Sequence, residues 1–206
     1  MFHYKAEQLD KKQQYKLVSG SVIPRPIAWV TSLSKDGSVV NAAPFSFFSA
    51  ASNELPLLTV AILRKDGVIK DTARNILDRK EAVVHIVDQS VVEEMNRTSA
   101  PLPPDQSEID QTQLTLVDSL SVKVPSIAEA KIRFEGVLHQ YIPVKNEKDE
   151  VVTDFFFIRV TDFFFDEAVF DQEKEYILTD KLNPVARLAG NQYAKLDEEF
   201  TIVRPN

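Results

Sequence analysis

The chain has 206 residues, of which 44% are hydrophobic and 27% are charged, a composition typical of globular proteins and not of disordered ones. The 24 Lys and Arg residues against 31 Asp and Glu leave a net charge of −7, without the positive field that attracts nucleic acid or anionic membranes. The chain contains no cysteine, which excludes disulfides, thiolate nucleophiles and cysteine-bound metal centres. The longest apolar stretch, residues 55–63, is too short to cross a bilayer, and no secretory signal is visible. We therefore expect a cytoplasmic protein with neither nucleic acid nor a membrane as partner.

Several common catalytic and cofactor motifs are missing. The five glycines are too far apart to form G-x-G-x-x-G or a phosphate loop, which argues against a Rossmann dinucleotide site. The three histidines, His3, His85 and His139, are scattered along the chain and form no metal-binding motif. The serine hydrolase motif G-x-S-x-G is also absent.

The first half of the chain is rich in predicted strands. Asp36-Gly37 and Asp66-Gly67 each follow a β-prone run, and the first of them lies between two such runs, which predicts a tight hairpin turn. The predicted strands are residues 27–33, 39–40, 57–63 and 81–87.

Three short helices are predicted before, between and after these strands. Residues 6–17 form a lead-in helix that overlaps an N-terminal lead-in segment, residues 1–15, and residues 91–97 form another. Residues 71–77 form the third, and Asp71 or Thr72 is expected to cap its first free N–H groups.

The second half begins with a long irregular segment. Residues 98–113 contain three prolines and few apolar residues, a composition typical of a lid or binding loop. Strands are predicted at residues 121–124, 131–141 and 153–160, the last continuing through 163–169, with a polar turn at 146–150. In the C-terminal segment, residues 182–206, residues 182–196 contain Pro184 and are mildly helical. With no linker and no internal repeat, residues 1–206 are expected to form a single mainly-β domain with a few peripheral helices.

Two phenylalanine triplets, residues 155–157 and 163–165, carry further information. Side chains alternate between the two faces of a strand, so three consecutive rings place apolar surface on both faces. A closed barrel with helices packed outside it, or an interface between subunits, would cover both faces. Most of these rings are expected in the core, and the remainder indicate a homodimer.

Two segments combine residue types that suit a phosphorylated aromatic ligand. Lys70 and Thr72 lie at a predicted helix start, where free N–H groups and the helix dipole favour an anion such as phosphate. Residues 41–49 are small, hydroxylated or aromatic and are interrupted by Pro44, which lacks an N–H group and breaks the strand ladder. Backbone groups left unpaired along an apolar slot suit the edge of a flat heteroaromatic ring.

Together with Pro24-Arg25-Pro26-Ile27-Ala28-Trp29-Val30-Thr31-Ser32, these segments resemble the flavin reductase-like family, and most closely its flavoredoxin type. The family patterns P-R-P-I-A-x-V-[ST]-[ST], N-x-A-P-x-S-[FY]-F and K-D-T-x-x-N-I are present residue for residue and in order. Weaker similarities are residues 95–98 with Ser107-Glu108, and residues 184–193, in which Ala189 replaces the usual glycine. The resemblance covers residues 15–196.

The resemblance implies a Greek-key split β-barrel of about six to seven antiparallel strands that binds FMN, typically as a homodimer. In such a homodimer, Tyr193 and residues 98–110 are expected to complete the partner's site. It also implies no catalytic side chain and no metal, because the flavin performs the chemistry. The isoalloxazine would be lined by Asn41, Ala42, Ala43, Pro44, Phe45, Ser46 and Phe47, with backbone groups of the last two at the N5 edge. The phosphate would be held by Lys70 and Thr72, with secondary contributions to the cofactor from Arg25, Thr31, Ser32 and Asn75.

Purely structural interpretations of the same residues remain open at this stage. Residues 70–72 also fit a solvated, capped helix start, and residues 41–49 fit plain barrel wall. Arg25, between two prolines, also fits a surface guanidinium. His85 and Trp29 fit the core better than a catalytic role.

The implied function is that of an oxidoreductase that passes electrons from NAD(P)H through FMN to a second flavin, an oxygenase or another acceptor protein. One alternative is an FMN electron carrier with little NAD(P)H turnover of its own. Another is a barrel that has lost its cofactor and serves as an interaction module.

Overall fold

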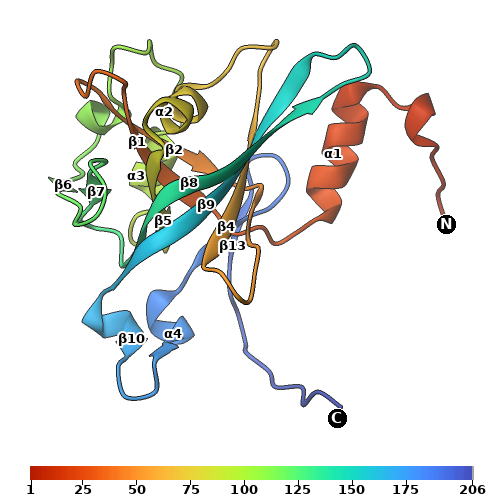
Figure 1. Cartoon of the computed structure of the whole chain (residues 1–206). Helices are drawn as coiled ribbons and strands as arrows, with labels where there is room; N and C mark the ends of the chain where they lie inside the picture. Colours follow the sequence, from red (N-terminus) through yellow and green to blue (C-terminus); the bar gives the residue numbers. More distant parts are fainter. Residues whose placement is uncertain (206) are drawn as a thin grey trace.

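Seven antiparallel strands build one curled sheet, in the order β2-β1-β5-β8-β9-β4-β3, in the computed structural model, which describes residues 1–205 (Figure 1). The strands are β1 (Ala28–Leu33), β2 (Val40–Phe45), β3 (Phe48–Ala50), β4 (Leu57–Leu63), β5 (Glu81–Ile86), β8 (Ile132–Lys145) and β9 (Val151–Phe165). The edge strands β2 and β3 are consecutive in the chain, separated by Ser46 and Phe47 alone. The sheet therefore curls back on itself, and its two edges come together at this bend. The expected mainly-β split barrel is confirmed.

The two predicted Asp-Gly turns are confirmed. Gly37 has a φ of +82° in the hairpin between β1 and β2. Asp66 and Gly67 have φ values of +53° and +77°, and the Val68 N–H donates to the Lys65 carbonyl at 3.0 Å. Left-handed backbone at these positions suits glycine and aspartate, which explains why the dipeptide marks both turns.

The helices lie on either side of the sheet: Figure 1 shows α1 on one side of the long β8–β9 ribbon and α2 and α3 on the other. The α-helices are α1 (Lys11–Ser21), α2 (Asp71–Arg79), α3 (Val92–Arg97) and α4 (Thr179–Leu182), and the 3-10 helices are η1 (Ala6–Gln8), η2 (Glu108–Gln111) and η3 (Glu167–Val169). The lead-in helix begins later than predicted because Asp10 and Gln13 form a capping box, with bonds of 2.7 and 2.9 Å. Within the described residues, no helix is long and apolar enough to cross a membrane.

Three predictions for the second half of the chain are wrong. Residues 121–124 are not a strand, because the N–H groups of Leu120 and Ser121 donate to the buried Glu135 carboxylate at 2.8 and 2.7 Å and hold this segment as bends. Short strands flank it instead, β6 (Leu116–Val117) and β7 (Ser126–Ile127).

The C-terminal segment forms a hairpin in place of the predicted helical structure. Its strands are β12 (Val185–Arg187) and β13 (Tyr193–Lys195). The backbone of Arg187 pairs with that of Arg25 through bonds of 2.8 and 3.1 Å, and this pairing holds the segment extended. Strand β9 also ends at Phe165, short of the predicted residue 169, and η3 and the small β10 (Phe170–Asp171) and β11 (Tyr176–Ile177) pair follow.

Strand β1 is buried on both faces and separates two apolar clusters. Ala28 and Val30 pack into the barrel cluster, whereas Ile27 and Trp29 pack into a second cluster that includes Met95 of α3. The core placement expected of Trp29 is confirmed, and its indole N–H donates to the Thr98 hydroxyl at 2.9 Å. The placement of α3 and the start of the 98–113 segment is therefore tied to β1.

The phenylalanine triplet at 155–157 alternates as expected. Phe156 is fully buried in the barrel cluster, and the half-buried Phe155 and Phe157 pair with each other at 5.2 Å between ring centroids. In the second triplet, Phe163 is 52% exposed. Strand β9 thus buries Phe156 in the barrel, while Phe163 beyond the β-bulge keeps accessible aromatic surface.

Gly136 in β8 should not tolerate a side chain. A Cβ atom there would lie 2.6 Å from Cγ2 of Ile158 and 3.0 Å from the Arg159 carbonyl oxygen on β9. We expect Gly136→Ala to lower the free energy of unfolding by about 1–3 kcal/mol in urea denaturation, because two paired strands must separate locally. Gly20→Ala in α1 is the control: a Cβ atom there would meet Cβ of Ala189 at an ordinary 3.8 Å, so stability should be unchanged or slightly higher.

Candidate functional site

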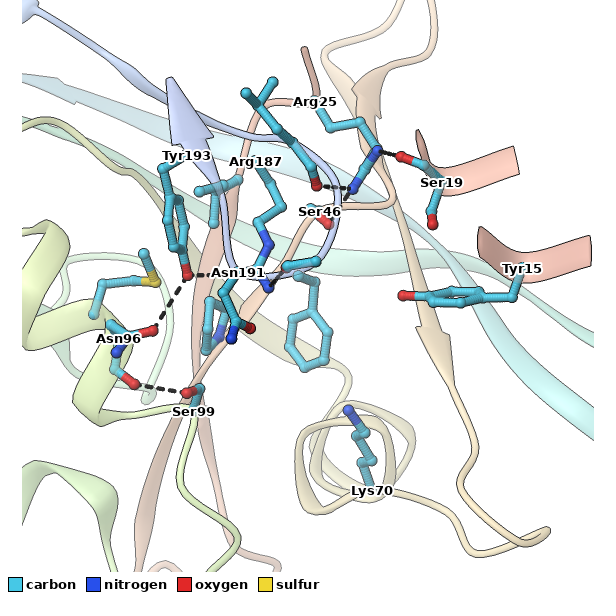
Figure 2. A pocket seen from close by; sticks show the side chains of 16 residues that line it. Tyr15, Ser19, Arg25, Ser46, Lys70, Asn96, Ser99, Arg187, Asn191 and Tyr193 are labelled. Carbon is cyan, nitrogen blue, oxygen red and sulfur yellow. Dashed lines mark hydrogen bonds between the residues drawn. The ribbon is translucent and has the colours of Figure 1, made fainter. Parts of the chain in front are cut away.

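A cavity of about 810 Å³ opens where α1, the β2–β3 bend, the start of α2, α3 and the β12–β13 hairpin meet (Figure 2). Its charged lining residues are all cations, namely Arg25, Lys70 and Arg187, and no Asp or Glu is among the described residues that line it. In a chain with a net charge of −7, this is a local reversal of sign. The cavity is therefore suited to an anionic ligand.

A second cavity of about 500 Å³ lies next to the first. The two share Pro44, Phe45, Lys70 and Ser99 in their linings, so these residues stand at the boundary between them. The smaller cavity is bordered by residues 98–102 and differs in charge, because Asp66, Asp71 and Glu108 also line it. The favourable place for an anion is the larger cavity and its boundary.

Unpaired backbone groups lie at the bend between β2 and β3. Of the backbone N–H and C=O groups of Ser46 and Phe47, the Phe47 carbonyl alone has a backbone partner within residues 1–205, the N–H of Ala61 at 2.8 Å. Pro44 has no N–H group, and Ser46 lines the larger cavity. The bend therefore offers backbone N–H donors beside an apolar floor formed by Pro44 and Phe45.

Lys70 immediately precedes α2 and occupies its N-cap position. The prediction that Asp71 or Thr72 caps this helix is wrong, because the helix begins at Asp71 itself and no side chain accepts from its first N–H groups. Asp71 forms an ion pair with Arg74 instead. The first turn of α2 therefore keeps uncapped donors beside a cation.

The Lys70 side chain faces the cavity without a carboxylate partner. Its ammonium lies 5.6 Å from the centroid of the Phe45 ring, and no ion pair to Lys70 forms within residues 1–205. Its accessible surface borders the cavities, while the surrounding protein lowers its pKa through desolvation. An anionic ligand would relieve this cost.

Four of the predicted site residues form a buried network beside the larger cavity, and two of them, Asn41 and Thr72, line the smaller one. The Thr72 hydroxyl donates to Oδ1 of Asn41 at 2.6 Å, and the Ser32 hydroxyl donates to the same atom at 3.3 Å. The amide of Asn75 donates to the Ser32 hydroxyl at 3.2 Å. All four side chains are buried. The network ties β1 and β2 to the first turns of α2.

The remaining predicted residues divide into two groups. Thr31 is fully buried and donates its hydroxyl to the Pro125 carbonyl at 2.7 Å, away from both cavities. Ala43 borders the smaller cavity, Ala42 lies in the core cluster behind it, and Phe47 packs against Tyr15 at 6.4 Å. The structure thus brings together Arg25, Pro44, Phe45, Ser46 and Lys70 at the larger cavity.

Arg25 is buried, so its interpretation as a surface guanidinium is wrong. Its N–H groups donate to the carbonyls of Ser19, Val22 at 2.6 Å and Leu188 at 2.9 Å, and its Nε reaches the Ser46 hydroxyl at 3.5 Å. The side chain joins the end of α1 to the C-terminal segment and the β2–β3 bend, as Figure 2 shows for Ser19 and Ser46. The guanidinium therefore shapes the cavity wall with most of its donors already used.

Glu108 ties the 98–113 segment to this site. Its buried carboxylate accepts from Nδ2 of Asn41 at 2.8 and 2.9 Å and from the Ala42 N–H at 3.1 Å. Burial raises the pKa of Glu108. The neighbouring Ser107 hydroxyl donates to the Val40 carbonyl at 2.5 Å. The segment is thus anchored at its far end on β2, and the weak similarity at Ser107-Glu108 was the only signal in the sequence for this role.

Removing the Glu108 carboxylate should loosen the segment. In Glu108→Ala, the buried donors of Asn41 and Ala42 lose their partner, so we expect a loss of about 1–3 kcal/mol in unfolding free energy. Hydrogen exchange should accelerate at residues 107–111. Glu93→Ala, at an exposed position on α3, is the control and should change neither quantity. Equal exchange in both variants would contradict the anchoring role.

The C-terminal hairpin supplies the opposite wall of the larger cavity. The Arg187 guanidinium donates to the Tyr193 hydroxyl and to the Gly190 carbonyl, and it lies 4.5 Å from the centroid of the Tyr193 ring. The Tyr193 hydroxyl donates to Oδ1 of Asn96 on α3 at 3.2 Å. In Figure 2, Lys70 and Arg187 reach toward the cavity from opposite sides. The role of this hairpin as a cavity wall was missed by its prediction as mildly helical.

Comparisons with known proteins agree with this architecture. A Bacillus subtilis (strain 168) protein named as uncharacterized protein YwrF is 50% identical over 206 residues, which is 100% of both chains. The crystal structure of nitrilotriacetate monooxygenase component B from Bacillus cereus is 42% identical, with a TM-score of 0.94 over 98% of each chain. Pseudomonas fluorescens 2-nitrobenzoate 2-nitroreductase NbaA is 31% identical, with a TM-score of 0.88 over 99% of this chain and 96% of that one.

The sequence model of the flavin reductase like domain matches residues 19–182, which include β1 to β9, the β2–β3 bend and the whole of α2. A flavoredoxin from Desulfovibrio vulgaris (Miyazaki F) shares the fold at 19% identity, with a TM-score of 0.73 over 88% of this chain. The chain therefore belongs to the flavin reductase-like family of split-barrel proteins.

Proposed function

We propose that this protein is an FMN-binding oxidoreductase that passes electrons from NAD(P)H through the flavin to a second acceptor. The observation that carries the proposal is the cavity lined by cations and by no described carboxylate, with free backbone donors at its floor, in a flavin reductase-like chain. A flavin mononucleotide has a flat apolar ring with hydrogen-bonding edges and one phosphate. Each of these parts has a counterpart in the cavity.

The residues fit FMN as follows. Pro44, Phe45 and Ser46 would hold the ring, and the N–H groups of Ser46 and Phe47 would be the donors for its N5 edge. Lys70 and the uncapped first turn of α2 would hold the phosphate. When bound, FMN supplies the hydride-accepting chemistry at N5, and the protein's part is to bind and orient it.

The buried network positions these groups. Its hydrogen bonds hold β2 against α2, and they therefore fix the distance between the β2–β3 bend and Lys70. The members of the network are Ser32, Asn41, Thr72 and Asn75. Thr72 already donates its hydroxyl to Asn41, so its share in phosphate binding is as an N–H donor and a spacer. Arg25 acts in the same way, through Ser46 and the carbonyls that it binds.

The acceptor is proposed to be an oxygenase or another electron-accepting protein. Support comes from the 42% identical relative, which is named as component B of a monooxygenase. We also propose a cytoplasmic homodimer. Exposed apolar side chains support a subunit interface. They lie on α1 and the turn after it, with exposed fractions of 45–60%, and on β9: Leu17, Val18, Val22, Ile23 and Phe163.

Steady-state oxidation of NADH and NADPH, with and without added FMN, tests the proposed reaction. We expect turnover with at least one of the two nucleotides when flavin is present. An FMN-loaded protein that oxidises neither nucleotide would instead support an electron carrier. A protein that binds no flavin would support an interaction module and contradict the proposal.

A further inference from the structure

The C-terminal wall of the larger cavity carries a cation that the proposed FMN phosphate site does not use. Arg187 has five N–H donors, of which two are bonded within residues 1–205, to the Tyr193 hydroxyl and the Gly190 carbonyl. No ion pair to Arg187 forms among these residues. Its ring contact with Tyr193, at 4.5 Å, fixes the plane of the guanidinium. The remaining donors are therefore held in one orientation at the cavity.

The surroundings of Arg187 favour an oxyanion. Asn191 lines the cavity beside it and makes no side-chain hydrogen bond within the described chain, and Ser99 and Asn96 line the facing wall. Gly190, with a φ of +57°, turns the hairpin so that Asn191 follows directly on the bonded carbonyl. A fixed guanidinium fork with an amide donor nearby matches the geometry of phosphate oxygens.

We propose that Arg187, with Asn191, forms a second anion subsite that binds the pyrophosphate of the pyridine nucleotide. This inference rests on the proposed function, because Lys70 is assigned to the flavin phosphate from the opposite side of the cavity (Figure 2). The volume of about 810 Å³ lies in the upper part of the range for small-molecule pockets. The pyrophosphate is the charged group closest along the molecule to the nicotinamide that must reach the flavin.

Titration calorimetry with ADP-ribose tests this subsite directly. ADP-ribose carries the pyrophosphate but neither nicotinamide nor flavin, so it is titrated into the full chain both with and without added FMN. We expect Arg187→Gln to weaken ADP-ribose binding by about tenfold or more, because a charged hydrogen-bonding partner is lost. Binding of adenosine, which has no phosphate, should not change. Added salt should weaken ADP-ribose binding to the native chain more than to Arg187→Gln.

Two further variants separate charge from structure. Arg187→Lys keeps the charge and should retain most of the salt dependence. Tyr193→Phe removes the hydroxyl bonds to Arg187 and Asn96 but keeps the cation and the ring, and it should change ADP-ribose affinity by no more than about threefold. If Tyr193→Phe loses as much affinity as Arg187→Gln, the guanidinium has only a structural role and the subsite is overturned.

The remaining outcomes keep this inference distinct from the proposed function. If Arg187→Gln weakens FMN binding and leaves ADP-ribose unchanged, the guanidinium belongs to the flavin site, and the subsite is overturned while the proposed function stands. If the native chain binds ADP-ribose through Arg187 but takes up no FMN, the subsite stands and the flavin assignment fails. A native chain that binds no ADP-ribose in either form contradicts the subsite.

Discussion

The double variant Lys70→Ala with Thr72→Ala should bind FMN about 2–4 kcal/mol more weakly than the native chain in a fluorescence titration. Lys70 offers an ammonium without a described carboxylate partner at an uncapped helix start. We expect most of the loss from Lys70, because the Thr72 hydroxyl already donates to Asn41 at 2.6 Å. The single variant Thr72→Ala should therefore act mainly by disturbing the Asn41 network.

Riboflavin, which has the ring but no phosphate, provides the ligand control. Its affinity for the native chain and for Lys70→Ala should be equal, because Lys70 is assigned to the phosphate alone. Lys65→Ala is the matched protein control: Lys65 is an exposed lysine that lines only the smaller cavity. If Lys65→Ala and Lys70→Ala weaken FMN equally, the effect is one of general charge and the phosphate assignment is wrong.

Folding stability should fall by about 2 kcal/mol between pH 7 and pH 5 because of His85 alone. Burial lowers the pKa of this histidine from 6.5 to about 4. Its Nδ1 bonds to the Trp29 carbonyl at 2.8 Å, and its Nε2 accepts from the Ile127 N–H at 2.9 Å, so an added proton has no acceptor. The unfolded chain takes up this proton below pH 6.5 and the folded chain does so only near pH 4. Stability is therefore complete above pH 6.5 and declines as the pH falls toward 4.

The comparison of two histidine variants isolates this effect in urea denaturation. His85→Gln should lose overall stability but also the extra pH dependence between 6.5 and 4. His139→Gln, at an exposed position on β8, should keep the native pH dependence. Glu108 does not mimic the effect, because burial raises its pKa and its uptake of a proton favours the folded state as the pH falls. An unchanged pH dependence in His85→Gln would show that carboxylates, and not His85, cause the acid sensitivity.

Local patterns predicted most of the sheet. The structure contains the predicted turn at Asp36-Gly37 and the predicted strands over 57–63 and 81–87. Each depends on the backbone preference and the apolar character of a few neighbouring residues, which the sequence shows directly. Residues 121–124 and the C-terminal hairpin were mispredicted, because distant partners decide their conformation. The Glu135 carboxylate holds the first segment, and backbone pairing with Arg25 holds the second.

The candidate site could be predicted in outline only. The residue types at 41–47 and 70–72 indicate an anionic aromatic ligand from the sequence alone, because proline, small residues and a cation at a helix start have local effects. Which side chains reach the cavity depends on long-range hydrogen bonds. The Arg25 guanidinium donates to the carbonyl of Leu188, which is 163 positions away in the sequence. The Glu108 carboxylate accepts from the amide of Asn41. No local pattern contains such partners.

The absorption spectrum of the purified protein, with an FMN titration of the same sample, tests the central claim most directly. We predict either a bound flavin spectrum that is released by heat as FMN, or saturable binding of added FMN near one molecule per chain. Bound FMN should be displaced more readily in Lys70→Ala than in Lys65→Ala. A colourless protein that binds neither FMN nor riboflavin would contradict the assignment of this cavity to a flavin.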